Sequence, residues 1–321
     1  MSRHILATIA IGLFAASCIG QTTSSDGLNL SPRDLSSPRE ISAEIAGLPV
    51  VWRPGGSGGS GSGPVYLDGR PGPTVRAPEH ATEIAMSLSR RYYAYATSLL
   101  PGGDIGIMDS STGETRILVN GSDRFPGAGL SFPSFADEER SVVFEVVGDD
   151  RIDLGVVDIS TGKVQFLDLG GGFNQQPIAS PDGRFYLVVC EREGGVGFSL
   201  CLVNRDTRTR NQLVEDQVFW NGAFTPSGTL VVFVGVSGGV LGEGSVHVVQ
   251  VDGNNNRTLV TGLGSGAVVL GATSQDAVYT CRDPERPACS SVCAIGLDGE
   301  DPRRLSYLGE RCVESGSDAS P

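Results

Sequence analysis

The sequence has 321 residues, of which 39% are hydrophobic and 45 are glycine, so a large core and many tight turns are expected. Its formal net charge is −13, which repels phosphate backbones and anionic lipid head groups. Composition and charge therefore argue against nucleic-acid binding and against an electrostatic contact with a membrane surface.

Residues 1–17 are predicted to be a signal peptide. A positively charged start precedes an apolar run, Ile5–Ala16, that is too short to span a bilayer. The stretch AASC that ends at Cys18 resembles the lipobox of bacterial lipoproteins, which implies that Cys18 is acylated. Ordinary secretion with an unmodified Cys18 is the alternative. Either route takes the protein out of the cytoplasm.

The next segment, residues 18–40, is rich in Ser, Pro and Asp and has few large apolar residues. Such a composition predicts a flexible linker between the lipid anchor and a folded body. At the other end, residues 314–321 are predicted to be a disordered tail.

A pattern recurs six times between residues 65 and 305: an apolar residue, a tight turn and a closing Val or Leu. Most of the turns contain Asp-Gly or Thr-Gly, which tolerate positive φ, so each unit is predicted to be strand, turn, strand. The closing residues lie 43 to 49 residues apart and are Val75, Leu118, Leu167, Leu213, Leu259 and Leu305.

Another predicted strand precedes each unit, and a turn such as Ser180–Arg184 and a further short strand precede several of these. Each repeat thus supplies about four short strands, the content of one propeller blade. The sequence therefore predicts an all-β fold, a six-bladed β-propeller of four-stranded antiparallel blades over residues 41–313. The preceding strands are Val50–Trp52, Tyr92–Ala96, Ser141–Val147, Phe185–Val189, Thr229–Val234 and Ala277–Thr280.

The turn Ser180–Arg184 and the units ending at Leu259 and Leu305 resemble the WD-repeat-like motifs of the TolB family. The resemblance extends over about residues 41–310 and implies a six-bladed propeller that binds a protein or peptide. TolB proper also has an N-terminal α/β domain, and we expect none here, because the residues before 41 are assigned to the signal peptide and the linker.

Apart from Cys18, six cysteines remain, an even number that favours disulfides in an exported protein. Fifteen pairings are possible, but aligning the repeats places Cys190–Cys201 and Cys281–Cys293 at matching positions. Each pair is expected to join the two middle strands of a blade as direct neighbours. Cys289–Cys312 is the remaining pair. A zinc site built from the last four cysteines is the alternative.

Short catalytic patterns are present without the context that catalysis needs. G-x-S-x-G occurs at Gly55–Gly59 and Gly235–Gly239, in Gly-rich hairpin tips with no helix behind them. His80 and His247 have no evident partner in the sequence. We therefore expect a protein without enzyme activity, metal or cofactor.

A propeller hydrolase or lactonase with a site in the central channel is the alternative. Such a site needs acidic or amide side chains on the innermost strands, where the sequence offers Glu83, Gln176 and Asn221. A further acidic group at a hairpin tip is predicted to be solvated charge: Asp149, Asp150 and Asp153.

The loops at the strand 2–3 tips and between blades share one face of a propeller, and in this sequence they are long and varied. Aromatic residues near the predicted channel entrances stand among amides and Arg, as in many binding patches. Packing of these aromatics between blades or inside the channel is the alternative. The predicted binding residues are Arg124, Phe125, Phe173, Asn174, Gln175, Trp220 and Asn221.

These observations together predict a monomeric protein of the bacterial cell envelope, facing the periplasm or the cell exterior and attached to the membrane through lipid on Cys18. Its partner is expected to be an envelope protein or peptide. A cell-wall carbohydrate is a further alternative, suggested by Trp220 near a predicted channel mouth.

Overall fold

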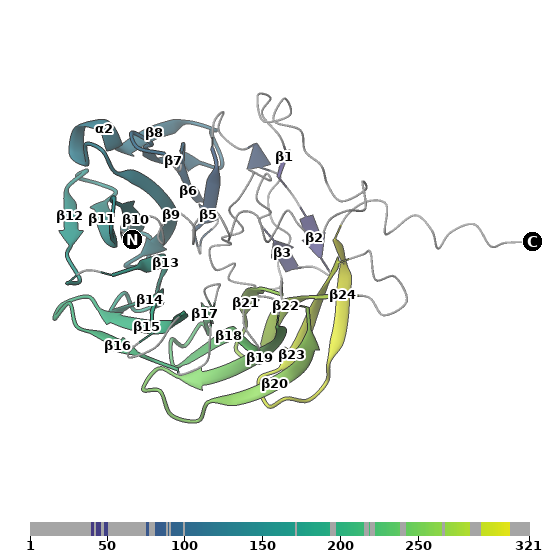
Figure 1. Ribbon diagram of the computed structural model, residues 1–321. Coiled ribbons are helices and arrows are strands. Elements are labelled where there is room, and N and C mark those ends of the chain that lie inside the picture. Colours follow the sequence, from purple (N-terminus) through teal and green to yellow (C-terminus); the bar gives the residue numbers. More distant parts are fainter. Residues whose placement is uncertain are drawn as a thin grey trace, which may run out of the picture.

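The computed structural model (Figure 1) describes the main body of the chain. The described residues are 40–41, 43–45, 48–50, 75–76 and 81–308, the last range without 88, 90, 99, 171, 193–196, 215–217, 219–221, 238–241, 265–266 and 283–289. The predicted signal peptide, Cys18, most of the linker and the tail lie outside these residues, as do His80, Trp220, Asn221, Cys289 and Cys312.

Five four-stranded antiparallel sheets make up the described body, and in each one the strands pair in chain order. The first two are β5 (Glu83–Met86), β6 (Tyr92–Ala96), β7 (Ile105–Asp109) and β8 (Thr115–Val119), then β9 (Gly129–Ala136), β10 (Ser141–Val147), β11 (Ile152–Asp158) and β12 (Val164–Leu167). The third is β13 (Asn174–Ala179), β14 (Phe185–Glu191), β15 (Phe198–Asn204) and β16 (Arg210–Gln212). The last two are β17 (Ala223–Phe224), β18 (Leu230–Ser237), β19 (Glu243–Gln250) and β20 (Arg257–Leu263), then β21 (Val269–Ala272), β22 (Asp276–Arg282), β23 (Ser290–Gly296) and β24 (Arg303–Leu308).

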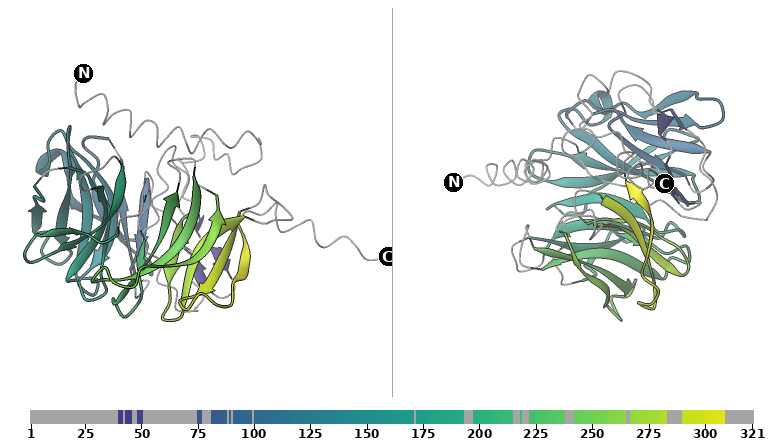
Figure 2. Two further views of the ribbon diagram at one scale, coloured as in Figure 1. Left: turned by 60° about the horizontal axis from the view of Figure 1, so that its bottom comes forward. Right: turned by 90° about the vertical axis from the view of Figure 1, so that its right-hand side faces the viewer.

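The sheets are arranged around a common axis with their first strands innermost (Figure 1). Strand β5 contacts β9, β9 contacts β13, and β17 contacts β21, so the first strands of successive sheets meet near the axis. The tilted view in Figure 2 shows the sheets standing next to one another. The predicted all-β propeller of four-stranded antiparallel blades is confirmed.

A repeated hydroxyl explains the turn between the first and second strands. Ser87, Ser180 and Thr225 end their inner strands, and each side-chain oxygen accepts a hydrogen bond from a backbone N–H at the start of the next strand, at 3.1, 3.0 and 3.3 Å. Thr273 accepts equivalently from the Asp276 N–H at 2.8 Å. Such local bonds favour a turn over a continued strand, which is the physical content of the Ser180–Arg184 motif.

An acidic residue closes the turn between the third and fourth strands. The Asp158 carboxylate accepts from the Ser160 hydroxyl at 2.7 Å and from the Thr161 N–H at 2.7 Å. These bonds, led by the one from Ser160, lower the pKa of Asp158 to about 2. Gly162 follows at φ 67°, a conformation that glycine adopts without strain.

Adjacent sheets bury their faces against each other. Val142, Phe144 and Val146 of β10 pack with Ala94 and Ala96 of β6 in one core cluster, and all are nearly inaccessible to solvent. Equivalent clusters lie between each following pair of sheets. Burying one such side chain stabilises the fold by about 1.5–3 kcal/mol, which a single exposed sheet could not gain.

Two glycines make room for aromatic rings on the sheet faces. Gly155 lies directly opposite Phe144, and a Cβ added at Gly155 would lie 2.3 Å from Phe144 Cζ. Gly106 lies directly opposite Tyr95 in the same way, again with a ring atom 2.3 Å from the added Cβ. In both sheets the ring of the second strand thus occupies the space that a side chain on the third strand would need.

The faces at the two ends of the arc are also buried. Tyr93 and Tyr95 alternate with Ala94 and Ala96, so they point away from the β9–β12 sheet, yet they are only 1% and 4% exposed. On the last sheet, Val292 is likewise 0% exposed on the face opposite Ile295. Both terminal faces are therefore covered, as a closed ring requires.

Between these end faces lie the short strands β1 (Glu40–Ile41), β2 (Ala43–Ile45) and β3 (Leu48–Val50) (Figure 1). Strand β2 pairs with β3, and β1 pairs with β4 (Val75–Arg76), so the described residues show two two-stranded pairings where a four-stranded first blade was expected. These short strands come before the five described sheets in the sequence, where the first blade was expected. A complete sixth blade stays a prediction.

One turn of helix, α2 (Gly121–Arg124), lies in the loop between β8 and β9, where the sequence predicts only a connection. The side chain of Asn120 caps it by accepting from the Asp123 N–H at 3.1 Å. Within the described part of the chain, no helix is long and apolar enough to cross a membrane.

Two of the three expected disulfides are confirmed: Cys190–Cys201 between β14 and β15, and Cys281–Cys293 between β22 and β23. The expectation that the paired residues are direct neighbours is wrong, because Cys190 is opposite Ser199 and Cys281 is opposite Ser291. The bonds run diagonally. Strand twist brings one diagonal closer, and the Cα atoms lie 5.8 and 5.9 Å apart.

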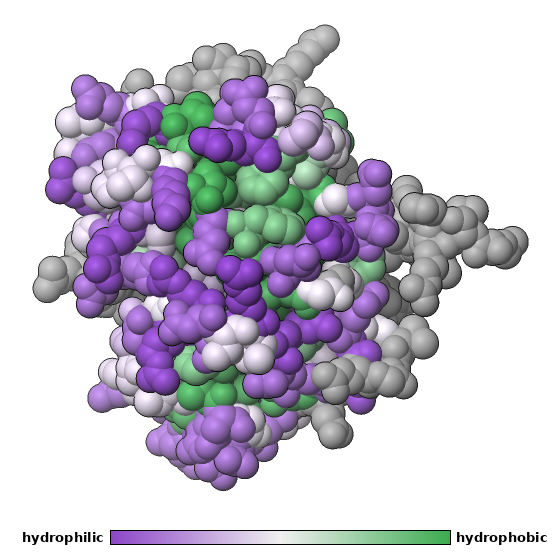
Figure 3. All heavy atoms as spheres, turned by 90° about the vertical axis from the view of Figure 1, so that its left-hand side faces the viewer, coloured by the Kyte–Doolittle hydropathy of each residue, from purple (hydrophilic) through white to green (hydrophobic). Residues whose placement is uncertain are grey.

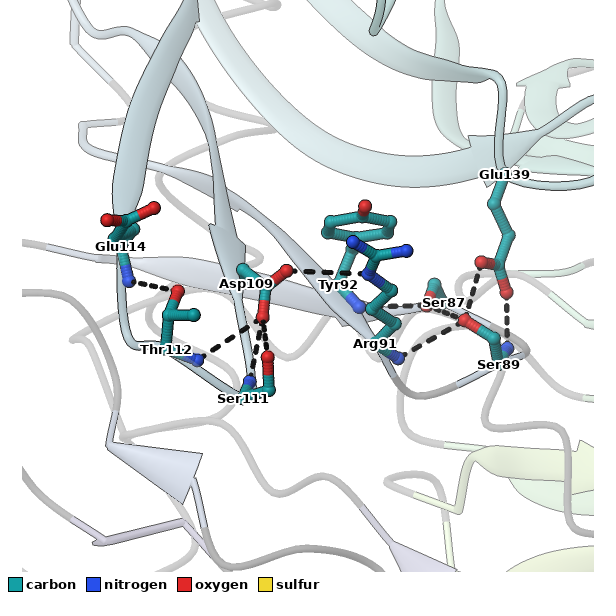
Figure 4. Close-up of polar contacts among 9 residues, drawn as sticks. All are labelled: Ser87, Ser89, Arg91, Tyr92, Asp109, Ser111, Thr112, Glu114 and Glu139. Atoms are coloured by element: carbon teal, nitrogen blue, oxygen red, sulfur yellow. Dashed lines mark hydrogen bonds and ion pairs between the residues drawn. The ribbon is translucent and has the colours of Figure 1, made fainter.

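A polar clamp on the side of the strand 1–2 turns joins neighbouring sheets (Figure 4). The Glu139 carboxylate, in the turn between β9 and β10, accepts from the Ser89 hydroxyl at 2.6 Å and from the Ser89 N–H. From the same turn, Asp137 pairs with Arg205 of the following sheet. The turn therefore contacts the sheets on both of its sides.

Candidate functional site

An aromatic cluster lies between the loop that carries α2 and the outer strand β12. The Phe125 ring packs against Phe144, with centroids 6.2 Å apart, and against Phe166, with centroids 6.0 Å apart. Phe144 is fully buried, whereas Phe125 and Phe166 are partly exposed. Gly155 on β11 lies directly opposite Phe144 on β10 and directly opposite Phe166 on β12. Because Gly155 has no side chain, the three rings can come together above it.

Arg151 extends this cluster along the same sheet. Its guanidinium carbon lies 5.7 Å from the centroid of the Phe166 ring. Its Nε lies 3.1 Å from Asp153 Oδ2, and its Nη1 lies 3.5 Å from Asp168 Oδ1. The arginine side chain is 43% exposed, so it is held in place while still presenting a surface to solvent.

Asp153 anchors the next loop. Its side chain is 1% exposed, and Oδ1 accepts from the Leu169 N–H at 3.2 Å. Burial raises the pKa of Asp153, while the Leu169 N–H and Arg151 act in the opposite direction. The prediction of a solvated charge is therefore wrong for Asp153, although Asp149 and Asp150 are exposed as expected.

The loop that follows β12 brings Phe173 to the far end of this surface. Phe173 packs edge-to-face against Phe198, with centroids 6.4 Å apart, and forms a parallel bridge to Ile152. Asn174 is 0% exposed, donates to the Ile152 carbonyl at 3.0 Å and accepts from Arg210 at 2.9 Å. Asn174 thus holds the loop in place and offers no exposed surface of its own.

Contacts join Phe125, Phe166, Arg151 and Asp168 into one group, and a further contact joins Phe173 in the loop after β12 to Phe198 of the neighbouring sheet. We call the two groups together the aromatic strip: Phe125, Phe166, Arg151, Asp168, Phe173 and Phe198. Figure 3 views the side of the molecule on which β12 lies, where hydrophobic residues are visible among hydrophilic ones. Partly exposed rings can bind apolar groups and the fixed arginine beside them can donate hydrogen bonds at the same surface, while the conformational entropy of these side chains is already reduced.

Four of the seven predicted binding residues lie on or beside the strip. Phe125 and Phe173 belong to it, Arg124 is exposed next to Phe125, and Gln175 is partly exposed at the start of β13. The prediction that Phe125 stands near a channel entrance is wrong, because the ring packs against the outer strand β12. Trp220 and Asn221 lie outside the described residues.

The sequence reasoning missed Phe166 and Arg151. Phe166 lies in a strand of the repeat, where an aromatic residue is normally interpreted as part of the hydrophobic core. Arg151 lies in a hairpin tip that also contains acidic residues, so it gave no sign of a specific role. The position of Gly155 could have indicated the cluster, because a glycine in the middle of a strand often marks a place where an aromatic ring lies over the backbone.

Two carboxylates near the axis form bonds between sheets. Glu145, 3% exposed, accepts from the Ser131 hydroxyl at 2.5 Å and from the Gln176 N–H of the next sheet. Glu83, 1% exposed, accepts from the Phe132 N–H. Gln176 and Phe132 have positive φ, 53° and 48°, at irregular positions of the inner strands. At these irregular positions the N–H groups of Phe132 and Gln176 donate to the two carboxylates instead of to a neighbouring strand.

Of the two candidate histidines, His247 lies within the described residues. His247 stacks on Phe233, with ring centroids 5.0 Å apart, on a sheet face. In the described ranges, no group of three or more His, Cys, Asp or Glu side chains is arranged to hold a metal ion.

Neither a protein-family model nor a curated protein matches the chain. Among solved structures, TolB from Acinetobacter baumannii is similar, with 15% identity and a TM-score of 0.56 over 84% of this chain and 62% of that one. An oligogalacturonate lyase from Vibrio parahaemolyticus has 13% identity and a TM-score of 0.51, covering 70% of this chain and 64% of the lyase.

A puromycin hydrolase is also similar, with 15% identity and a TM-score of 0.52 over 76% of this chain and 42% of the hydrolase. The chain spans less than two thirds of the length of each of these proteins. At such identities the likeness concerns the fold and not the activity. The two disulfides indicate an extracytoplasmic compartment. In fold, the chain is a TolB-like β-propeller.

Proposed function

We propose that this is an exported, lipid-anchored protein of the cell envelope that binds a protein or peptide partner through the aromatic strip. The observation that carries the proposal is the set of partly exposed rings at Phe125, Phe166 and Phe173, with the Arg151 guanidinium over the Phe166 ring. Aromatic residues, phenylalanine included, and arginine are enriched at protein interfaces.

The way the strip is held also supports this role. Arg151 is fixed by two carboxylates, and the Phe173 loop is fixed by the buried Asn174. A partner therefore pays little to order these side chains on binding. The buried carboxylates of Glu83 and Glu145 already bind backbone N–H groups, so we propose a binding role and not a catalytic one.

Site-specific photo-crosslinking in the native envelope tests the surface. A photoreactive residue is placed at Arg124, beside the strip, and a matched one at Arg184, which is exposed in the turn between β13 and β14. The proposal expects a discrete crosslinked protein from position 124 and none from position 184. Equal products from both positions, or no product from position 124, would refute a partner at the strip.

A variant separates binding from folding. Phe173→Ala and Gln175→Ala, introduced together into the protein that carries the photoreactive residue at position 124, remove partly exposed surface without touching the buried Phe144. The expected result is loss of the crosslink, with unchanged circular dichroism and thermal midpoint. Retention of the crosslink would exclude these side chains from the interface.

The lipid anchor is tested independently at Cys18. The proposal expects that wild-type protein partitions with membranes, that mass spectrometry finds acyl chains on Cys18, and that Cys18→Ala releases the protein to the soluble fraction. An unmodified Cys18 would leave ordinary secretion as the route.

A further inference from the structure

The two disulfides form a matched pair in equivalent positions. Each joins the second and third strands of its sheet along the same diagonal, with Cα atoms 5.8 and 5.9 Å apart. Geometry therefore gives no reason for them to differ in reactivity. Any difference has to come from what surrounds the sulfur atoms.

The surroundings differ in accessibility. Cys190 and Cys201 are 0% and 2% exposed and belong to the core cluster between the second and third sheets. Cys281 and Cys293 are partly exposed and lie at the edge of the cluster between the last two sheets. Partial exposure favours attack on the second pair by a thiol in solution, whereas attack on the first pair requires local opening of a packed core.

The surroundings also differ in charge. The residue opposite Cys293 on the neighbouring strand is Arg304, which is exposed. At the equivalent place beside the buried disulfide, the residue opposite Cys201 is Gln212. Directly opposite residues point to the same face of a sheet, so a cation lies on the side of Cys293 and a neutral amide on the side of Cys201.

We propose that Cys281–Cys293 is a thiol–disulfide exchange site for a dithiol reductant, and that Cys190–Cys201 is its inert structural counterpart. A thiolate of the reductant attacks Cys281 Sγ. The bond to Cys293 Sγ breaks, and Cys293 leaves with the electron pair as a thiolate next to Arg304.

The second thiolate of the reductant then attacks the reductant sulfur that is bound to Cys281. This step releases Cys281 as a thiolate and leaves the reductant as an intramolecular disulfide. Two electrons and two protons pass from the dithiol to the two protein sulfurs. The product lacks the covalent link between the middle strands of the last sheet, while the third sheet keeps its own.

The test is timed reduction of the folded full-length protein with dithiothreitol, followed by alkylation and peptide mass mapping of every cysteine. Cys281 and Cys293 are expected to be alkylated about 100-fold faster than Cys190 and Cys201, because only the latter pair requires opening of a core cluster. In about 6 M guanidinium chloride both pairs lose their surroundings, so the ratio is expected to fall to about one. Equal native rates, or faster reduction of Cys190–Cys201, would overturn the proposal.

Two further measurements test the roles of the sulfurs. With glutathione as a single thiol, the mixed disulfide is expected on Cys281 and not on Cys293. Arg304→Gln is expected to slow reduction about threefold, the effect of a leaving-group pKa raised by roughly one unit. Arg282→Gln is the matched control, because Arg282 adjoins Cys281 in sequence but points to the other face of the strand. A mixed disulfide on Cys293, or equal slowing by both variants, would overturn the assignment of the leaving group.

Discussion

Gly155 gives the sharpest test of how the strip and the core depend on each other. In Gly155→Ala, the added Cβ lies 2.3 Å from Phe144 Cζ and 2.4 Å from Cε2. Carbon atoms in contact normally lie about 3.5–4.0 Å apart, so the ring must move by more than about 1 Å. Phe144 is 0% exposed and already packs against Phe125, which leaves it little space. Overpacking of this kind costs about 1–3 kcal/mol.

Urea unfolding measures this cost. With a slope of about 3 kcal/mol per molar urea, a loss of about 2 kcal/mol lowers the midpoint by roughly 0.7 M. Gly148→Ala is the matched control, because its added Cβ would be no closer than 3.5 Å to the nearest atom, Arg151 O. The control is expected to be neutral or to gain up to about 1 kcal/mol from reduced entropy of the unfolded chain.

A second substitution isolates the contact. Phe144→Leu in the Gly155→Ala background removes the ring atoms that clash, so the double variant is expected to be more stable than the sum of the single effects predicts, by about 1 kcal/mol or more. Additive effects, or a Gly155→Ala variant as stable as the wild type, would refute the argument that this glycine exists to accommodate the ring.

Three other predictions concern buried and turn residues. The hydroxyl of Tyr186 is buried without a hydrogen-bond partner among the described residues, so Tyr186→Phe is expected to keep or raise the urea midpoint; a loss above about 1 kcal/mol would contradict this. Burial also raises the pKa of Tyr186 to about 12, so its contribution to stability is present below pH 10 and is lost as the pH rises toward 12. The urea midpoint of Tyr186→Phe should therefore fall less than that of the wild type over this pH range. The pKa of Asp158 is lowered to about 2, so its contribution to the free energy of unfolding is present above pH 4 and is lost as the pH falls toward 2. Asp158→Asn should therefore make the urea midpoint depend less on pH between pH 4 and pH 2. The same pH dependence in the variant and the wild type would contradict this prediction. Glu145→Ala leaves the Ser131 hydroxyl and the Gln176 N–H without their acceptor and should cost about 2–4 kcal/mol, with Glu145→Gln costing about half; equal stability of all three proteins would exclude an inter-sheet role.

Local chemistry made much of the fold predictable. The turn residues Ser180 and Asp158 bond within a few residues of themselves, so their patterns mark strand ends in the sequence. The equivalent places of the cysteines in two repeats predicted both confirmed disulfides. Their diagonal register was not predicted, because it depends on strand twist and not on sequence spacing.

Features that depend on contacts between sheets were missed. Asp153 stands in an acidic tip, a position that predicts a solvated charge, yet its side chain is 1% exposed and binds the Leu169 N–H of the loop after β12. The hydrogen bond from the Gln176 N–H to Glu145 of the preceding sheet depends on a β-bulge at Gln176, and no sequence pattern predicts that bulge. The strip was found only in part for the same reason: Phe166 and Phe125 are far apart in sequence and meet through the gap at Gly155.

The strand order has a consequence for how such a chain is made. In every four-stranded sheet of the described body, each strand pairs with its immediate predecessor, starting at the axis and ending at the rim. Hairpins of this kind form from residues that emerge consecutively, so each sheet is able to assemble while the remainder of the polypeptide is still being threaded through an export channel. Joining the two terminal faces is different, since it requires segments from opposite ends of the body. In the predicted six-bladed ring this closure depends on the first and the last parts of the body, so we expect it to be the last step of assembly.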